Sequence, residues 1–175
     1  GLGKTIEAGL IWTELRSRFD ARRLLVLCPA ILRDKWKTEL QNRFGINAEL
    51  CNARQLLATL QDYRRGESDT FAMIGSLQGL RPPSGWNSEE DVLEGPTAEL
   101  ARLLDDSEHD DPLFDLVIVD EAHYLRNPET LTARLGKLVR PVTDAMVLLS
   151  ATPIQTSNSD LYSLVRLIDE DNFAH

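Results

Sequence analysis

The sequence predicts an α/β domain with a mainly parallel β-sheet and helices on both faces. Three short stretches, at 23–28, 116–119 and 147–149, are almost continuously apolar, which is typical of strands buried on both faces. Segments with apolar residues at helical spacing separate these stretches, as connections between parallel strands require. Polar residues follow each stretch, and the carboxyl ends of parallel strands meet at one edge of a sheet, where ligands bind. A length of 175 residues suits one such domain.

The first elements follow from periodicity. Residues 5–19 are expected to form a helix with one apolar stripe, made by Ala8, Ile11, Trp12, Leu15 and Phe19. A strand over 23–28 ends at Pro29. A second helix over 31–43 carries Leu32, Trp36 and Leu40 at intervals of four, so we expect Trp36 to pack in the core and not to stack on a nucleic-acid base.

The remaining elements are less regular. Further strands are expected at 47–51, 70–75, 116–119 and 147–149, and a last helix over 159–168. No apolar run approaches the roughly 20 residues that a membrane span needs. No signal peptide is visible, and Cys28 and Cys51 match no zinc spacing. These features favour a cytoplasmic protein, without a membrane partner, in which both cysteines are core residues.

The acidic residues are concentrated in one part of the chain. Residues 89–115 hold eleven acids and one arginine, a net charge of −10, against −9 for the whole chain. The working surfaces elsewhere are therefore close to neutral. We interpret 80–112 as an acidic surface insertion, with one short helix near 97–105. Its dense charge and low apolar content predict loose packing.

The chain opens with part of a phosphate-binding motif. Gly1, Leu2, Gly3, Lys4 and Thr5 match the second half of G-x-x-x-x-G-K-[ST]. Glycine lets backbone N–H groups turn toward phosphate oxygens, and the helix that follows adds its positive amino end. In such a loop the lysine reaches the β- and γ-phosphates of ATP and the threonine hydroxyl binds Mg²⁺.

A second motif follows the strand at 116–119. Asp120 and Glu121 come directly after four apolar residues, the pattern of a Mg²⁺ site on a nucleotide. Asp120 is the expected metal ligand, and Glu121 is placed to deprotonate an attacking water. The alternative is an ordinary strand end with two solvated acids, but a phosphate loop on the same chain favours catalysis, with Lys4 as the third catalytic residue.

Several stretches resemble the Snf2 (Swi2/Snf2) family of superfamily 2 helicase-like ATPases. Asp120-Glu121-Ala122-His123 spells the D-E-A-H box, and Ser150-Ala151-Thr152-Pro153-Ile154-Gln155 is similar to the third motif of that family. Cys28-Pro29-Ala30-Ile31-Leu32 with Trp36, and Asp160-Leu161-Tyr162-Ser163-Leu164, also look Snf2-like. The opening Gly1 to Ala8 resembles the group that includes the bacterial RNA polymerase-recycling ATPases. Thr156 departs from the usual asparagine, which leaves the subgroup open.

The resemblance implies a fold and further residue roles. The fold would be the first RecA-like P-loop NTPase lobe. His123, Ser150, Thr152 and Gln155 would couple the nucleotide site to the nucleic acid. Pro29, Arg33 and Ser76 would face the nucleic-acid backbone. The structural alternatives are a strand-end histidine satisfied by a neighbour, a solvated helix arginine, and a serine that caps a turn.

The resemblance also implies cofactors, partners and a larger protein. ATP and Mg²⁺ are the expected cofactors, and double-stranded DNA and a second RecA-like lobe the expected partners. RNA polymerase, or defence or repair proteins, are further candidates. The start of the phosphate loop and the second lobe are expected outside this chain, so the chain alone would be inactive. The alternatives are a strand-separating D-E-A-H-type RNA or DNA helicase, an ATPase without a track, and a non-catalytic interaction module.

Overall fold

The fold is an α/β sandwich built on a parallel sheet, seen in a computed structural model that describes residues 2–90, 92–106, 111–151, 164–166 and 168. Within these residues the strand order is β2-β3-β1-β4-β5, and every neighbouring pair is parallel. The strands are β1 (Arg23–Cys28), β2 (Glu49–Cys51), β3 (Phe71–Ser76), β4 (Phe114–Val119) and β5 (Thr143–Leu148). The parallel α/β sheet predicted from the sequence is therefore confirmed.

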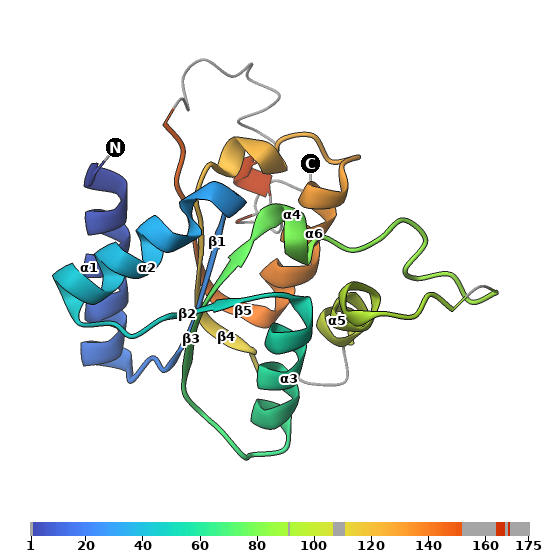
Figure 1. Cartoon of the computed structure of the whole chain (residues 1–175), viewed down its shortest axis with the longest axis horizontal. Coiled ribbons are helices and arrows are strands. Elements are labelled where there is room, and N and C mark those ends of the chain that lie inside the picture. Colours follow the sequence, from blue (N-terminus) through green and yellow to red (C-terminus); the bar gives the residue numbers. More distant parts are fainter. Residues whose placement is uncertain (1, 91, 107–110, 152–163, 167, 169–175) are drawn as a thin grey trace.

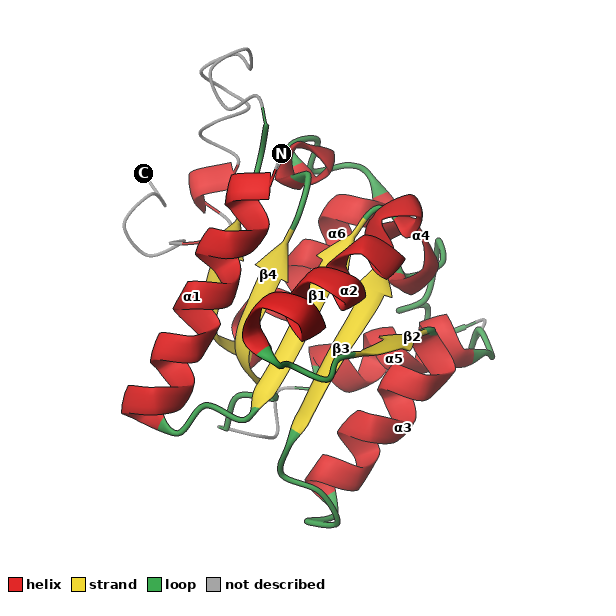
Figure 2. Cartoon of the chain, turned by 60° about the vertical axis from the view of Figure 1, so that its left-hand side comes forward, coloured by secondary structure: helices red, strands yellow, loops and turns green. Residues whose placement is uncertain are grey.

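Helices cover both faces of the sheet (Figure 1). They are α1 (Leu2–Phe19), α2 (Arg33–Phe44), α3 (Ala53–Arg64), α4 (Leu77–Leu80), α5 (Pro96–Asp105) and α6 (Leu131–Val139). Short 3₁₀ turns lie at Ala30–Leu32, Ala122–Leu125 and Arg140–Val142. Figure 2 shows α1 and α2 in front of the strands, and α3, α5 and α6 lie on the opposite face.

The core has two layers because successive strand residues point to opposite faces. In β1, Leu24 and Val26 pack under α1 and α2, whereas Leu25 and Leu27 pack under the helices of the other face. Residues 24–28 of β1 and 116–119 of β4 are buried in both layers, which explains why these stretches are continuously apolar.

The sequence expectations for the elements were largely, but not fully, met. The strands at 23–28, 47–51 and 70–75 match β1, β2 and β3 within a few residues, whereas β5 begins four residues before the expected 147. The first helix begins at Leu2 and not at residue 5. The expected helix over 159–168 falls mostly outside the described residues. The residues of this range that the structure describes, 164–166 and 168, are helical.

The prediction that residues 80–112 pack loosely is wrong for much of that segment. Trp86 is buried, and α5 places Ala98, Leu100 and Leu104 in the same core layer as α3. Arg64 on α3 donates to Asp106 and to the Leu103 carbonyl, both at 3.1 Å. The expected short helix near 97–105 is confirmed by α5. Whether the segment is an insertion stays a prediction.

In the part of the chain that the structure describes, no helix combines the length and the apolar character that crossing a membrane requires.

Candidate active site

The turn that follows β4 is fixed to the strands on both sides of it. The Asp120 backbone N–H donates to the Leu27 carbonyl at the end of β1 (2.8 Å). On the other side, the Leu149 N–H donates to the Val119 carbonyl (2.8 Å) and the Ala122 N–H donates to the Leu149 carbonyl (2.9 Å). Because three adjacent strand ends share these bonds, the backbone that carries Asp120 and Glu121 has little freedom to move.

The Asp120 carboxylate is buried and receives hydrogen bonds from three elements. Only 7% of the residue is exposed. Oδ1 accepts from the Glu121 backbone N–H (2.8 Å) and from Lys4 Nζ (3.4 Å), and Oδ2 accepts from the Trp36 indole Nε1 (3.0 Å). A buried carboxylate with several donors is held in one orientation. Sequence reasoning assigned Trp36 to the core, which is confirmed, but missed its hydrogen bond to Asp120.

Lys4 links the opening motif to the acidic pair. Its ammonium group, on the first turn of α1, lies 3.1 Å from Glu121 Oε1 and 3.4 Å from Asp120 Oδ1. Partial burial lowers the pKa of Lys4, but the hydrogen bond to Glu121 and the two negative charges outweigh this, so the pKa is raised. The structure therefore brings together the three residues that the sequence predicts to be catalytic.

Glu121 has a left-handed backbone, with φ 53° and ψ 47°. For a residue with a Cβ this conformation costs roughly 1–2 kcal/mol, and such strain is common at functional sites. His123 Nδ1 lies 3.2 Å from Glu121 Oε2, although the angles are not those of a hydrogen bond. The His123 ring also lies against the Tyr124 ring, with centroids 4.6 Å apart. The His123 ring is thus a neighbour of both the Glu121 carboxylate and the Tyr124 ring.

The donor groups at this edge suit Mg²⁺ bound to a nucleotide. Mg²⁺ in such sites takes one or two protein oxygens and completes its shell with phosphate oxygens and water. Asp120 supplies a carboxylate, and the hydroxyl-bearing Thr5 is 6% exposed on the first turn of α1 beside Lys4. Lys4 supplies the positive charge that phosphates require. Gly1 lies outside the described residues, and Gly3 is exposed with open space around it.

The proposed nucleic-acid residues lie along the same edge, at the ends of β1 and β3. Pro29 precedes the Ala30–Leu32 turn, and its carbonyl accepts from the Leu32 N–H (2.9 Å). Arg33 is half-buried, and its Nε donates to the Ala30 carbonyl (3.4 Å). Ser76 is buried and its hydroxyl accepts from the Gly79 N–H (2.9 Å), so it caps α4, which is the structural alternative stated above.

Of the proposed coupling residues the structure describes two. His123 lies beside Glu121, and Ser150 is half-buried directly after the β5 end and Leu149. Thr152 and Gln155 lie outside the described residues, so their proximity to this edge stays a prediction.

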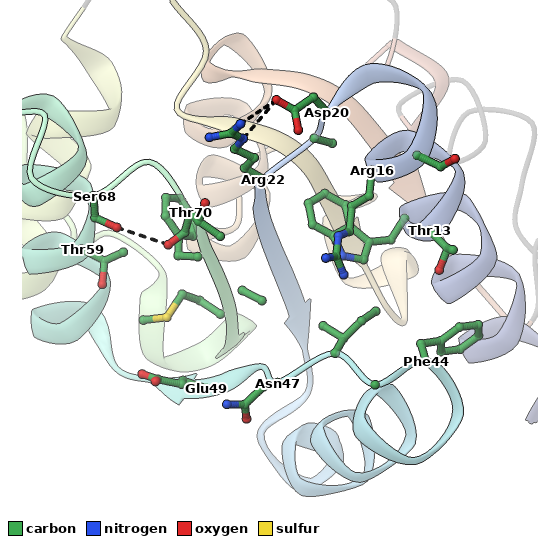
Figure 3. A pocket seen from close by; sticks show the side chains of 18 of the residues that line it. Thr13, Arg16, Asp20, Arg22, Phe44, Asn47, Glu49, Thr59, Ser68 and Thr70 are labelled. Atoms are coloured by element: carbon green, nitrogen blue, oxygen red, sulfur yellow. Dashed lines mark hydrogen bonds and ion pairs between the residues drawn. The ribbon is translucent and has the colours of Figure 1, made fainter.

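A depression of about 930 Å³ lies elsewhere and contains none of these residues (Figure 3). It opens between α1, β3 and the loop from Phe44 to Asn47. Its Arg22 already pairs with Asp20 (2.8 Å) and Asp69 (2.5 Å). The motif residues therefore converge outside this depression.

Two comparisons with known proteins identify the fold and the family. A solved structure from Sulfolobus solfataricus, described as the SWI2/SNF2 ATPase core in complex with dsDNA, superposes with a TM-score of 0.61 at 18% identity. The match covers 98% of this chain and 30% of that one, so the chain spans under a third of its length. The family model for the SNF2-related domain matches residues 1–175. The chain therefore belongs to the SNF2-related domain family and has the fold of the first RecA-like lobe of its ATPase core.

Proposed function

We propose that the chain is the ATP-binding lobe of a motor that hydrolyses ATP to move on double-stranded DNA. The observation that carries the ATPase part is the convergence of Lys4 with Asp120 and Glu121, which belong to motifs more than 100 residues apart in the sequence. Lys4 Nζ lies 3.4 Å from Asp120 Oδ1 and 3.1 Å from Glu121 Oε1. Family membership supports the use of ATP.

Each residue has a definite role in this proposal. Lys4 leaves the acids and neutralises phosphate charge, together with the amino end of α1. Asp120 and Thr5 hold Mg²⁺, which supplies positive charge against the phosphates and orients them. Glu121 accepts a proton from the attacking water. Releasing Lys4 also frees Glu121 Oε1 for that proton.

Two observations support the DNA part. The structural neighbour is described as a complex with dsDNA, and Pro29 and Arg33 lie at the same edge as the acidic pair. In this proposal His123, Ser150, Thr152 and Gln155 transmit the state of the nucleotide to the DNA. A second RecA-like lobe closes the site and supplies arginines to the phosphoryl group. We also propose a cytoplasmic location and, as the pathway, RNA polymerase recycling, repair or defence.

The test is ATP hydrolysis by the complete protein, with and without duplex DNA. Glu121→Gln should lower the hydrolysis rate about 10²–10⁴-fold and leave ATP bound, because the amide cannot accept a proton. Lys4→Ala should instead weaken ATP binding. Glu129→Gln and Lys35→Ala, at exposed positions, are the matched controls and should change neither. Wild-type hydrolysis by Glu121→Gln would refute the assignment.

The same assay tests the coupling residues. Ser150→Ala with Thr152→Ala should preserve basal hydrolysis and abolish its stimulation by duplex DNA. The ratio of stimulated to basal rate must be measured at one low salt concentration, because contacts with phosphates weaken steeply as salt rises. An unchanged ratio together with lower stability would mean that the two hydroxyls are only structural.

A further inference from the structure

Trp36 reaches the active site from α2, which carries none of the residues predicted to be catalytic. It lies in the first half of α2, and 2% of it is exposed. Its ring belongs to the core layer of Ala8, Leu40, Ile118 and Leu149, which α1 and α2 form with one face of the sheet. This packing fixes the indole plane, so its Nε1–H has one direction in which to donate.

That direction leads to Asp120. The indole donates to Oδ2 at 3.0 Å, in a buried contact between residues 84 positions apart. An indole N–H can only donate and carries no charge. The bond therefore orients the carboxylate without neutralising it, whereas Lys4, 3.4 Å from Oδ1, brings a positive charge.

The two donors behave differently when a nucleotide binds. Lys4 is shared with Glu121 and, in the proposed function, moves to the phosphates. Among the described residues this leaves two donors to the Asp120 carboxylate, the Glu121 backbone N–H on Oδ1 and Trp36 on Oδ2. Of these two donors the indole acts on Oδ2, whereas the backbone bond is local and acts on the other oxygen.

We propose that Trp36 is a positioning residue for Asp120: its indole N–H holds Oδ2 so that the carboxylate faces the cation after Lys4 has left. The cation belongs to the proposed function, on which this inference rests. Trp12 provides an internal comparison, because it is 3% exposed in the same core layer but lies on α1. Partners that orient a metal ligand typically contribute 10–100-fold to metal affinity or activity.

The first experiment tests the contact without nucleotide. In ¹⁵N-labelled protein the loss of one indole N–H resonance in Trp36→Phe identifies the Trp36 resonance, and Trp12→Phe and Trp86→Phe identify the other two in the same way. Asp120→Asn should shift the Trp36 resonance upfield and speed its exchange with water, because a neutral amide is the weaker acceptor. The resonances of Trp12 and Trp86 should move less. A Trp36 resonance that does not respond to Asp120→Asn would overturn the proposal.

The second experiment measures the Mg²⁺ dependence of ATP binding and hydrolysis in the complete protein. Trp36→Phe should raise the Mg²⁺ concentration for half-maximal binding about 10–100-fold. ATP affinity at saturating Mg²⁺ should stay nearly constant. Trp12→Phe, with the same loss of volume, should leave the Mg²⁺ dependence unchanged. Equal effects of the two variants would mean that Trp36 only fills space.

A shape-preserving replacement guards against misfolding. Replacing Trp36 with 3-benzothienylalanine puts sulfur in place of the indole N–H and keeps the ring size, so it should reproduce the Mg²⁺ effect of Trp36→Phe. A wild-type Mg²⁺ dependence in this protein would overturn the proposal. Failure of the proposed function is distinguishable, because the wild-type protein would then show no Mg²⁺-dependent ATP binding or hydrolysis at all.

Discussion

Asp115 and Asp120 lie at opposite ends of β4 and are held in different ways. Asp115 accepts from the backbone N–H groups of Arg22 (2.7 Å) and Arg23 (2.8 Å), and from the Arg23 guanidinium (2.8 Å). Burial alone would raise the pKa of Asp115, but these donors and the Arg23 charge outweigh it, so the pKa is lowered. The donors to the Asp115 carboxylate come from Arg22 and Arg23 and serve a structural role, whereas Asp120 shares the Lys4 ammonium group with Glu121.

Asp115→Ala is expected to destabilise the domain by roughly 1–3 kcal/mol, because two backbone N–H groups lose their acceptor and the Arg23 guanidinium keeps only the Pro112 carbonyl among its acceptors in the described residues. Urea unfolding measures this change in the free energy of unfolding. Asp69→Ala is the matched control: Asp69 also pairs with an arginine, but its side chain is 70% exposed, and its removal should have a much smaller effect.

The lowered pKa of Asp115 also fixes the direction of its pH dependence. Its contribution is present above the usual pKa of the carboxyl, 3.8, and is lost as the pH falls through the lowered value in the folded protein. Below that range the wild-type and Asp115→Ala proteins should unfold at similar urea concentrations. A difference that persists unchanged at low pH would contradict this account.

Single residues were predictable where a local motif names the chemistry. Lys4, Asp120 and Glu121 stand in short motifs, so their convergence could be expected. The Trp36 bond to Asp120 joins positions 84 residues apart, and the helical stripe reports only that the ring is buried. The sequence left open whether Ser76 faces nucleic acid or caps a turn. The hydrogen bond from the Gly79 N–H to its hydroxyl, at 2.9 Å, shows that it caps α4, and no local pattern reports that bond.

At the scale of elements, α3 and α6 were not predicted. α3 begins with a reciprocal capping box between Asn52 and Gln55, a sequence signal for a helix start that was available. Thr130 caps α6 in a similar way by accepting from the Ala133 N–H. The prediction of loose packing for α5 was wrong for a different reason. It rested on the net charge of the whole segment, which hides the buried apolar stripe of α5 because the acidic residues lie outside that stripe.

Leu100→Ala tests the corrected place of α5. Because Leu100 is buried in the layer that contains α3, its truncation should cost about 2–5 kcal/mol of unfolding free energy. Glu99→Ala, at the neighbouring exposed position, should change it by less than about 0.5 kcal/mol. Chemical unfolding of both variants gives the comparison. A negligible effect of Leu100→Ala on the free energy of unfolding would support the original prediction that this segment packs loosely.

At the scale of the whole molecule, the sequence predicted the sheet type and the edge that gathers the motifs. It did not predict the strand order, because pairing between distant strands leaves no local pattern. β1 lies at the centre of the described sheet and β2 at one side, with only three residues. This difference in position should give the two strands different opening free energies.

The two cysteines can report that difference. Burial raises the pKa of both Cys28 and Cys51 to about 12, so neither thiol reacts while it stays folded. Cys51, on β2, should react with a thiol reagent through local opening, whereas Cys28, on β1, should react only through global unfolding. Single Cys28→Ala and Cys51→Ala proteins separate the two rates. Cys28 reacting as fast as Cys51 in native buffer would contradict this order.

The left-handed backbone of Glu121 sets stability against activity at one position. Glycine adopts φ 53° without the Cβ penalty, so Glu121→Gly would relieve strain in the turn. It would also remove the side chain proposed to accept the proton. A campaign that ranks substitutions only by melting temperature would therefore favour an inactive protein. Conservation of glutamate at this position among homologues would indicate that selection maintains ATP hydrolysis at the expense of thermal stability.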